Sequence, residues 1–344
     1  MTWWTPERFA ARRGFLERRA AVVAAVRAFF TQRGFLEVET PALQISPGLE
    51  PHIAVFATEL VEPFAQAKRT LYLHTSPEFT MKKLLAAGLP RIFQIARVYR
   101  NGERSPLHHP EFTMLEWYRA DADYSVLMDD CESLLREVMT AAGYPAFTWR
   151  NRLCNPHIPW QRLSVAEAFA RLAGIDLLAT LTDPADPDPA LLATAAGLPH
   201  RSTDRWEDVF FRIMLERIEP HLGHDRPAIL YDYPVPLAAL SRGKADDPRL
   251  AERFEVYACG VELANAYSEL TDVAVQRARF HHDVALRQRL YGTTVPVDED
   301  FLDALAHMPV AAGIALGIDR LVMLAVGAGT IEDVLWAPVS SGSW

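Results

Sequence analysis

The chain has 344 residues, of which 50% are hydrophobic and 23% charged, and its formal net charge is −9. This composition is typical of a globular protein, and the length suits one large domain or two ordinary ones. The acidic balance counts weakly against a nucleic-acid-binding protein, and no apolar run reaches the ~18 residues of a membrane span.

Signals for export or for a metal site are missing from the sequence. The first residues carry no long apolar segment of the kind found in a signal peptide. Cys131, Cys154 and Cys259 are far apart and lack metal-site spacing. Free cysteines in this pattern are typical of a reducing compartment, so we expect a cytoplasmic protein.

The first predicted element is a helix over 15–32, where apolar residues recur at helical spacing before a glycine. Strand-like alternation follows over 35–43 and ends at a proline. The segment 75–88 predicts a second helix with Ser76 as N-cap, a proline in the first turn and a closing glycine. Strands over 91–99 and 111–119 are expected to pair antiparallel.

The second half of the chain continues the mixed pattern. A helix is expected over about 125–142, and an insertion rich in Asp, Pro and Ala around 175–200 reads as a surface connection. Further strands are expected over 227–234 and 253–267, and further helices over 271–290 and 313–327. The pattern predicts an α+β fold, an antiparallel sheet flanked by helices in a single domain over 1–344.

The stretch YRNGERSPLHHPEF, residues 99–112, joins two predicted strands through a long polar loop. Arg100 offers a fork of donors suited to a phosphate, and Phe112 offers a ring on which a base can stack. Glu111 can accept a hydrogen bond from an exocyclic amine. On these residues alone, a hairpin with an exposed polar loop is the commoner explanation.

The stretch FEVYACGVELANAYSEL places Glu255, Glu262 and Glu269 seven residues apart. If the hairpin turns at Cys259 and Gly260, Tyr257 faces Glu262, and Glu255 lies diagonally from Glu262 on the same sheet face. Paired carboxylates on an apolar strand favour a cation, and oxygen ligands suit Mg²⁺. The alternative is three solvated glutamates on an exposed face.

The stretch GIALGIDRLVML carries Arg320 in a helix that follows two glycines, and this arginine could clamp a terminal phosphate. A glycine-flanked core helix, with Asp319 favoured in its first turn, is the simpler explanation. The adjacent His108 and His109 do not converge, so we predict no metal between them. The glycines are too few for a dinucleotide-binding loop.

Together these strings resemble the three signature motifs of class II aminoacyl-tRNA synthetases, from about residue 15 to the end. GFLEVETPAL is similar to motif 1, the dimer-forming element, YRNGERSPLHHPEF to motif 2 and GIALGIDR to motif 3. HHPEFTMLEWY and ELANAYSELTD are most similar to the lysyl branch. The resemblance implies the synthetase fold, ATP as substrate and a homodimer.

The resemblance also implies roles in catalysis and ATP binding. Arg100 would hold the amino-acid carboxylate and the α-phosphate, and Arg320 would clamp the γ-phosphate, so both are expected to be catalytic. Phe112 would stack on adenine, and Glu255 and Glu262 would hold Mg²⁺. Further ATP contacts are expected from Asn101, Gly102, His109, Glu111, Leu263 and Gly317.

For the amino acid, the resemblance implies a pocket that selects a cationic substrate. Glu78 would bind the backbone amine, with Ser76 beside it, and Tyr118 and Glu269 would bind the distal ammonium of lysine. Ala315 stands where lysyl-tRNA synthetases usually carry glycine. Its methyl group could favour an amine shifted by one carbon, and neutral drift explains it equally well.

We expect no anticodon-binding OB-fold, because only 14 residues precede the first predicted helix and 24 follow Arg320. It therefore resembles the lysyl-tRNA synthetase paralogues that modify translation elongation factor P. That resemblance implies that lysine, preferably (R)-β-lysine, is activated as an adenylate and transferred to a lysine side chain of the factor. No tRNA is expected as a partner.

Three departures from the usual motif 2 concern the loop tip, where Gly102, Leu107 and His109 replace Glu, Arg and Asn. Glu103 and Arg104 could substitute from neighbouring positions. The rival interpretations are a truncated synthetase that charges tRNA, an amide-forming ligase of the asparagine-synthetase type, and a regulatory core without activity.

Overall fold

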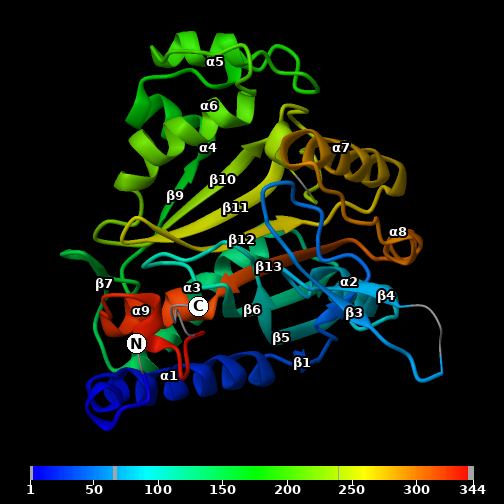
Figure 1. Cartoon of the computed structure of the whole chain (residues 1–344). Coiled ribbons are helices and arrows are strands. Elements are labelled where there is room, and N and C mark those ends of the chain that lie inside the picture. Colours follow the sequence, from blue (N-terminus) through cyan, green and yellow to red (C-terminus); the bar gives the residue numbers. More distant parts are fainter. Residues whose placement is uncertain (1–2, 65–67, 239, 340–344) are drawn as a thin grey trace. The chain divides into compact units, whose positions relative to one another are not determined.

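The structure is a computed structural model that describes residues 3–64, 68–238 and 240–339 (Figure 1). The chain divides into two compact units. The first comprises Met1–Asp121, Thr271–Ala311 and Ala315–Trp344, and the second Ala122–Leu270 and Ala312–Ile314. The predicted insertion around 175–200 lies within the second unit, and its place in a single domain stays a prediction.

The first unit combines long helices with two groups of strands. Its helices are α1 (Pro6–Gln32), α2 (Glu78–Ala86), α7 (Val273–Tyr291), α8 (Glu299–Leu305) and α9 (Ile318–Val326), and its strands are β1 (Leu36–Glu37), β2 (Leu43–Gln44), β3 (Phe56–Leu60), β4 (Arg69–Leu73), β5 (Arg91–Tyr99) and β6 (Glu111–Ala120). Strand β5 pairs with β6 antiparallel and with β1 parallel, while β4 pairs with β2 and β3. The antiparallel pair expected from the sequence is confirmed.

The second unit is built on a mixed group of strands. Its helices are α3 (Tyr124–Ala142), α4 (Val165–Ala168), α5 (Pro189–Ala196) and α6 (Trp206–Ile213), and its strands are β7 (Phe147–Trp149), β8 (Arg152–Cys154), β9 (Gln161–Ser164), β10 (Ala228–Pro234), β11 (Leu250–Ala258) and β12 (Val261–Ser268). Strand β9 pairs with β10 parallel, and β10, β11 and β12 pair antiparallel. Strand β13 (Ala311–Gly317) contributes residues to both units. The α+β prediction is confirmed.

Helix α1 begins nine residues before the predicted start. The prediction missed these first turns because they are largely exposed and carry no apolar stripe. Pro6 stands at the first helical position, where a missing N–H costs nothing. The later turns bury one face, and Phe30 stacks on Phe93 with ring centroids 4.9 Å apart. Trp117 packs on the same ring, so α1 covers the β5–β6 pair.

Three further predicted elements differ from the structure. Over 35–43 only Leu36–Glu37 forms a strand before β2 begins at Leu43. The helix over 75–88 is the shorter α2, whose N-cap is Pro77 rather than Ser76. The predicted helix over 313–327 begins only at Ile318, because the residues before it form β13. A run of small apolar residues has no periodicity that separates strand from helix.

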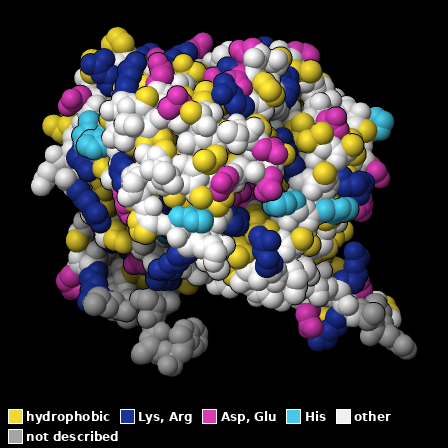
Figure 2. All heavy atoms as spheres, turned by 90° about the horizontal axis from the view of Figure 1, so that it is seen from above, with side chains coloured by type: hydrophobic (Ala, Val, Ile, Leu, Met, Phe, Trp, Pro, Cys, Tyr) yellow, Lys and Arg dark blue, Asp and Glu magenta, His cyan; other side chains and the backbone are white. Residues whose placement is uncertain are grey.

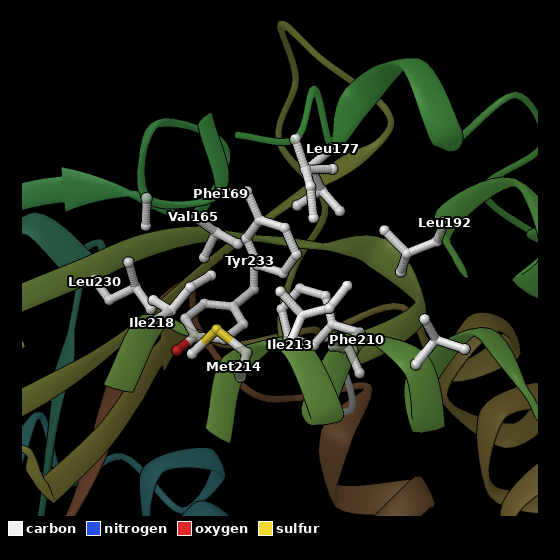
Figure 3. Packing of buried hydrophobic residues seen from close by; sticks show 14 of the residues in the cluster. Val165, Phe169, Leu177, Leu192, Phe210, Ile213, Met214, Ile218, Leu230 and Tyr233 are labelled. Atoms are coloured by element: carbon white, nitrogen blue, oxygen red, sulfur yellow. The ribbon is translucent and has the colours of Figure 1, made fainter. Parts of the chain in front are cut away.

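The Asp/Pro/Ala-rich segment is more than the predicted surface connection, because part of it enters the core. Asp188 caps α5, and Gly197 ends it in the left-handed region. Leu192 and Ala193 are buried in the cluster shown in Figure 3, which also contains Phe210 of α6. The segment is therefore an integral part of the second unit.

The surface is mixed in character. Figure 2 shows basic and acidic side chains interspersed over the face in view, without one continuous patch of either sign. Among the described residues, no helix is long and apolar enough to cross a membrane.

Candidate active site

Arg100 follows the last residue of β5 at the mouth of the motif 2 loop. Its backbone N–H donates to Pro110 at 2.9 Å, which closes the base of the loop. The guanidinium carbon lies 5.2 Å from the centre of the Phe112 ring. Its Nε is buried and has no hydrogen-bond partner among the described atoms. Arg100 and Phe112 are therefore brought together as the motif requires, with donor capacity on Arg100 left for a ligand.

The tip of this loop is a tight turn. Gly102 has φ +78°, a conformation that glycine adopts without strain, which gives a backbone reason for its replacement of Glu. Ser105 and His108 exchange backbone hydrogen bonds of 3.1 and 3.2 Å. Arg104 turns away and donates to Glu332 at 2.7 Å, so only Glu103, 3.9 Å from Arg100, stays near the loop mouth.

Arg320 of α9 reaches the same loop. It donates to the carbonyl of Leu107 at 3.3 Å and lies 2.7 Å from Nε2 of His108. Because a guanidinium only donates, His108 accepts through Nε2, and its Nδ1 donates to Ser105 Oγ at 2.7 Å. Burial and the charge of Arg320 both lower the pKa of His108, which matches this neutral form.

His109 is used inside the protein at both ring nitrogens. Nδ1 lies 2.6 Å from the carbonyl oxygen of Glu111, and Nε2 accepts from the backbone of Val339 at 3.1 Å. The side chain is buried. Its role in the described chain is therefore structural, and its predicted contact with ATP stays a prediction. The described residues contain no group of three metal-ligating side chains here or elsewhere.

Phe112 and Ala315 pack against the same small cluster of buried residues, Ala96, Val98 and Met114. Phe112 lies opposite Val98 in the β5–β6 register. Phe112, which is predicted to stack on adenine, and Ala315, which is predicted to contact the amino acid, thus pack on the same apolar cluster. Gly317 then serves as the N-cap residue of α9, three residues before Arg320.

Asp319 has a structural role that the sequence alone did not reveal. It forms an ion pair with Arg19 of α1 at 2.5 Å, and its other oxygen accepts from the backbone of Thr113 at 2.7 Å. Arg19 also donates to Thr113 Oγ1 at 2.9 Å. This buried network ties α1, β6 and the start of α9 together, and so positions Arg320.

The predicted substrate residues of the first unit form a compact polar cluster. Ser76 donates to Oε1 of Glu116 at 2.5 Å, and Tyr118 donates to its Oε2 at 2.8 Å. Ser76 also accepts from the backbone of Glu78 at 3.1 Å, and Glu78 pairs with Lys82 at 2.5 Å. Ser76, Glu78 and Tyr118 are therefore brought together, with Glu116 at the centre.

Burial changes the pKa values of the carboxyl groups in this cluster. Burial, followed by repulsion from Glu78, raises the pKa of Glu116 to about 8, although Ser76 and Tyr118 favour its ionised form. The pKa of Glu50 is raised for the same two leading reasons. An arriving ammonium group would relieve the repulsion between these carboxylates. The cluster is thus suited to a cationic ligand.

Glu116, Lys82 and Glu50 were not among the residues singled out in the sequence. A signal for Glu116 exists, because it stands two residues before Tyr118 on one strand, which places both on one face, and its chain neighbours Leu115 and Trp117 are apolar. Lys82 stands four residues after Glu78 on α2, the spacing of a helical ion pair. For Glu50 we find no signal in the sequence.

In the second unit, Glu255 is held by three donors. Tyr233 and Tyr257 donate to its Oε2 at 2.7 and 2.6 Å, and Arg253 donates to Oε1 at 2.6 Å. Oε1 keeps one lone pair for a further partner. Arg253 also donates to Asn265 on the neighbouring strand at 3.0 Å. The carboxylate is thus fixed in orientation.

The hairpin expected around these glutamates is confirmed. Cys259 and Gly260 have φ of 55° and 75°, as a two-residue hairpin turn requires, and Tyr257 lies opposite Glu262. A bulge at Leu263, which was not predicted, shifts the register beyond that pair. Leu263 itself is buried.

Glu269 follows β12 and is 1% exposed, against the alternative of solvated glutamates. It forms an isolated backbone bridge with Ser241. Because it belongs to the second unit and Tyr118 to the first, their predicted pairing stays a prediction.

Comparison with known proteins decides the family. The family model described as tRNA synthetases class II (D, K and N) matches residues 7–341. The chain belongs to this class II synthetase family. As a member of the family it is an ATP-dependent ligase.

Relatives of this synthetase cover almost the whole chain. One from Yersinia enterocolitica is 41% identical over 94% of both chains, and one from Pectobacterium carotovorum is 40% identical over 97% of both. A third, from Sodalis glossinidius, is 40% identical over 93% of both. All three are named elongation factor P–(R)-β-lysine ligase.

Proposed function

We propose that this class II synthetase activates lysine, with (R)-β-lysine preferred, and transfers it to a lysine side chain of elongation factor P. The observation that carries the proposal is the shared name of relatives about 40% identical over nearly the whole of both chains. The cluster of Glu50, Glu78 and Glu116 supports it independently, because it suits a substrate with ammonium groups.

The reaction has two steps. The substrate carboxylate attacks the α-phosphorus of ATP, so the aminoacyl adenylate forms and pyrophosphate leaves. An acceptor amine then attacks the carbonyl carbon of the adenylate, and AMP leaves as the new amide forms. Arg100 would stabilise the charge that develops on the α-phosphate and the carboxylate, and positioning would account for most of the remaining catalysis.

Contacts with ATP are proposed from the residues around the motif 2 loop. Phe112 would stack on adenine, flanked by Glu111, and Arg320 would leave Leu107 and His108 to clamp the γ-phosphate. Asn101 is already anchored through its backbone to Ala54 at 2.9 Å, which keeps the loop mouth in place.

Mg²⁺ is proposed to bind with ATP. Glu255 and Glu262 lie on one face of the β11–β12 hairpin, and Oε1 of Glu255 keeps a lone pair. These donors fit Mg²⁺, which is commonly bound through one or two carboxylates together with substrate phosphates. When bound, the ion would neutralise charge on the phosphates.

Two further proposals concern assembly and location. We expect a homodimer through the motif 1 segment, because Leu36, Leu43 and Ile45 are 54%, 45% and 52% exposed there. Sedimentation of the purified protein would give about twice the chain mass, and Leu43→Glu would shift it toward the monomer. Since the proposed acceptor is a translation factor, we place the enzyme in the cytoplasm.

The function is tested by determining which macromolecule becomes labelled. The protein is incubated with ATP, Mg²⁺ and labelled lysine or (R)-β-lysine, in the presence of both tRNA and elongation factor P. We expect label on the factor, and more of it with the β isomer. Label on tRNA alone would instead support the synthetase alternative, and loss of all label with Arg100→Ala would tie the reaction to this site.

A further inference from the structure

Glu50 lies in the loop before β3 and is held there from two sides. Gly48 has φ +115°, and a Cβ at that position would come within 2.7 Å of Thr75 Oγ1 and 2.9 Å of Glu50 Oε2. Glycine therefore lets the loop approach both groups. From α7, Arg287 donates to the carbonyls of Ile53 and Glu50 at 2.9 and 3.4 Å.

The carboxylate of Glu50 has a buried oxygen without a donor. Within the described residues, Oε2 receives no hydrogen bond. The neighbouring charges that act on Glu50 are those of Glu78, which repels it, and of Arg100 and Lys82, which attract it. A buried carboxylate oxygen without a donor is costly, so this arrangement is completed by a donor from a ligand.

We propose that Glu50 is a specificity-determining residue that accepts a hydrogen bond from the substrate ammonium next to the carboxylate, alongside Glu78. The inference rests on the proposed function, since that function supplies an amine in this place. Glu78 is already paired with Lys82, which takes up part of its capacity to accept hydrogen bonds. A second carboxylate is what an additional ammonium group requires.

The charges of the first unit support this assignment. Glu50, Glu78 and Glu116 bring three carboxylates, and Lys82 balances one of them. The first unit thus carries more carboxylates than Lys82 balances, which favours a ligand with an ammonium group, while Arg100 matches the substrate carboxylate. An acid without the amine beside its carboxylate leaves this excess of carboxylates uncompensated.

The test compares lysine with 6-aminohexanoate, which keeps the carboxylate and the distal amine but lacks the amine beside the carboxylate. Binding of each to the protein is measured by calorimetry for wild type, Glu50→Gln and Glu62→Gln. Glu62 is an exposed glutamate twelve positions along the chain and serves as the matched control. We expect Glu50→Gln to weaken lysine binding about 10- to 100-fold and 6-aminohexanoate binding less than about 3-fold.

Each other outcome would overturn the assignment. Equal weakening of both ligands would make Glu50 a structural residue, and unchanged lysine binding would remove it from the site. Wild type that binds both ligands equally well would also overturn it. Glu50→Asp keeps the charge and is expected to restore part of the preference for lysine. The binding measurements test Glu50 separately from the proposed function. If the proposed function is wrong, the wild-type enzyme will leave elongation factor P unlabelled in the labelling experiment.

Discussion

Arg19 of α1 and Asp319 of α9 form an ion pair 2.5 Å long, with their side chains only 5% and 1% exposed. The pair joins residues 300 positions apart in the sequence, at the helix that carries Arg320. Since Asp319 also receives the backbone N–H of Thr113, removal of Arg19 would leave a buried charge with less compensation.

The first prediction is that Arg19→Met lowers the free energy of unfolding by about 3–5 kcal/mol, the usual cost of breaking a buried ion pair. Arg13→Met is the matched control, because Arg13 pairs with Glu17 on the same helix at 71% and 62% exposure. Its cost should stay under about 1 kcal/mol. Urea denaturation of both variants measures the difference, and similar costs would argue against the buried network.

The second prediction concerns Arg100. Arg100→Ala should reduce lysine-dependent pyrophosphate exchange by at least about 100-fold, because it removes donors at the developing charge. The fold should survive, since the side chain is 26% exposed and its ion pair with Glu103 is 3.9 Å long. Arg104→Ala, in the same loop but paired with Glu332, should retain most of the activity. Unchanged exchange in Arg100→Ala would remove the motif 2 assignment.

The third prediction follows from the pKa of Glu116, about 8 in the folded chain against 4.5 ordinarily. At pH 6 the carboxyl is therefore protonated, and a bound ammonium must displace that proton. The KM for lysine should fall as the pH rises from 6 to 8, while the KM for ATP changes little. Glu116→Gln should abolish the slope, and a slope that persists would assign it to another group.

The same pKa makes a prediction for stability. Between pH 4.5 and 8 the folded chain holds a proton on Glu116 that the unfolded chain releases, so the free energy of unfolding falls as the pH rises through this window. Glu116→Gln cannot ionise and should lose less stability between pH 5 and 8. Thermal unfolding at a series of pH values gives the two curves, and parallel curves would contradict the prediction.

The fifth prediction separates the substrate pocket from the metal site. Glu269→Gln should weaken lysine binding at least about 10-fold and ATP binding much less, because the distal ammonium would lose a charged partner. Glu262→Gln serves as the comparison, with the larger effect expected on Mg²⁺-dependent ATP binding. Equal losses of lysine and ATP binding in Glu269→Gln would place Glu269 at the metal instead.

The sequence by itself determined the local elements whose signals are short-range. Alternation and turn chemistry located β5 and β6 and placed Tyr257 opposite Glu262, because strand period and a two-residue turn leave few registers. Motif order also indicated the family and the ends of the motif 2 loop.

Only the tertiary structure decided what depends on burial and on distant partners. The strand over Ala311–Gly317 has no periodicity of its own and is defined by its neighbours. Asp319 is an ordinary helix-start residue until Arg19 is placed against it. Likewise, Glu50 and Glu116 read as solvated glutamates until packing removes their water. The pKa of a carboxyl group depends on its burial and on neighbouring charges, and these are supplied by parts of the chain that are distant in the sequence.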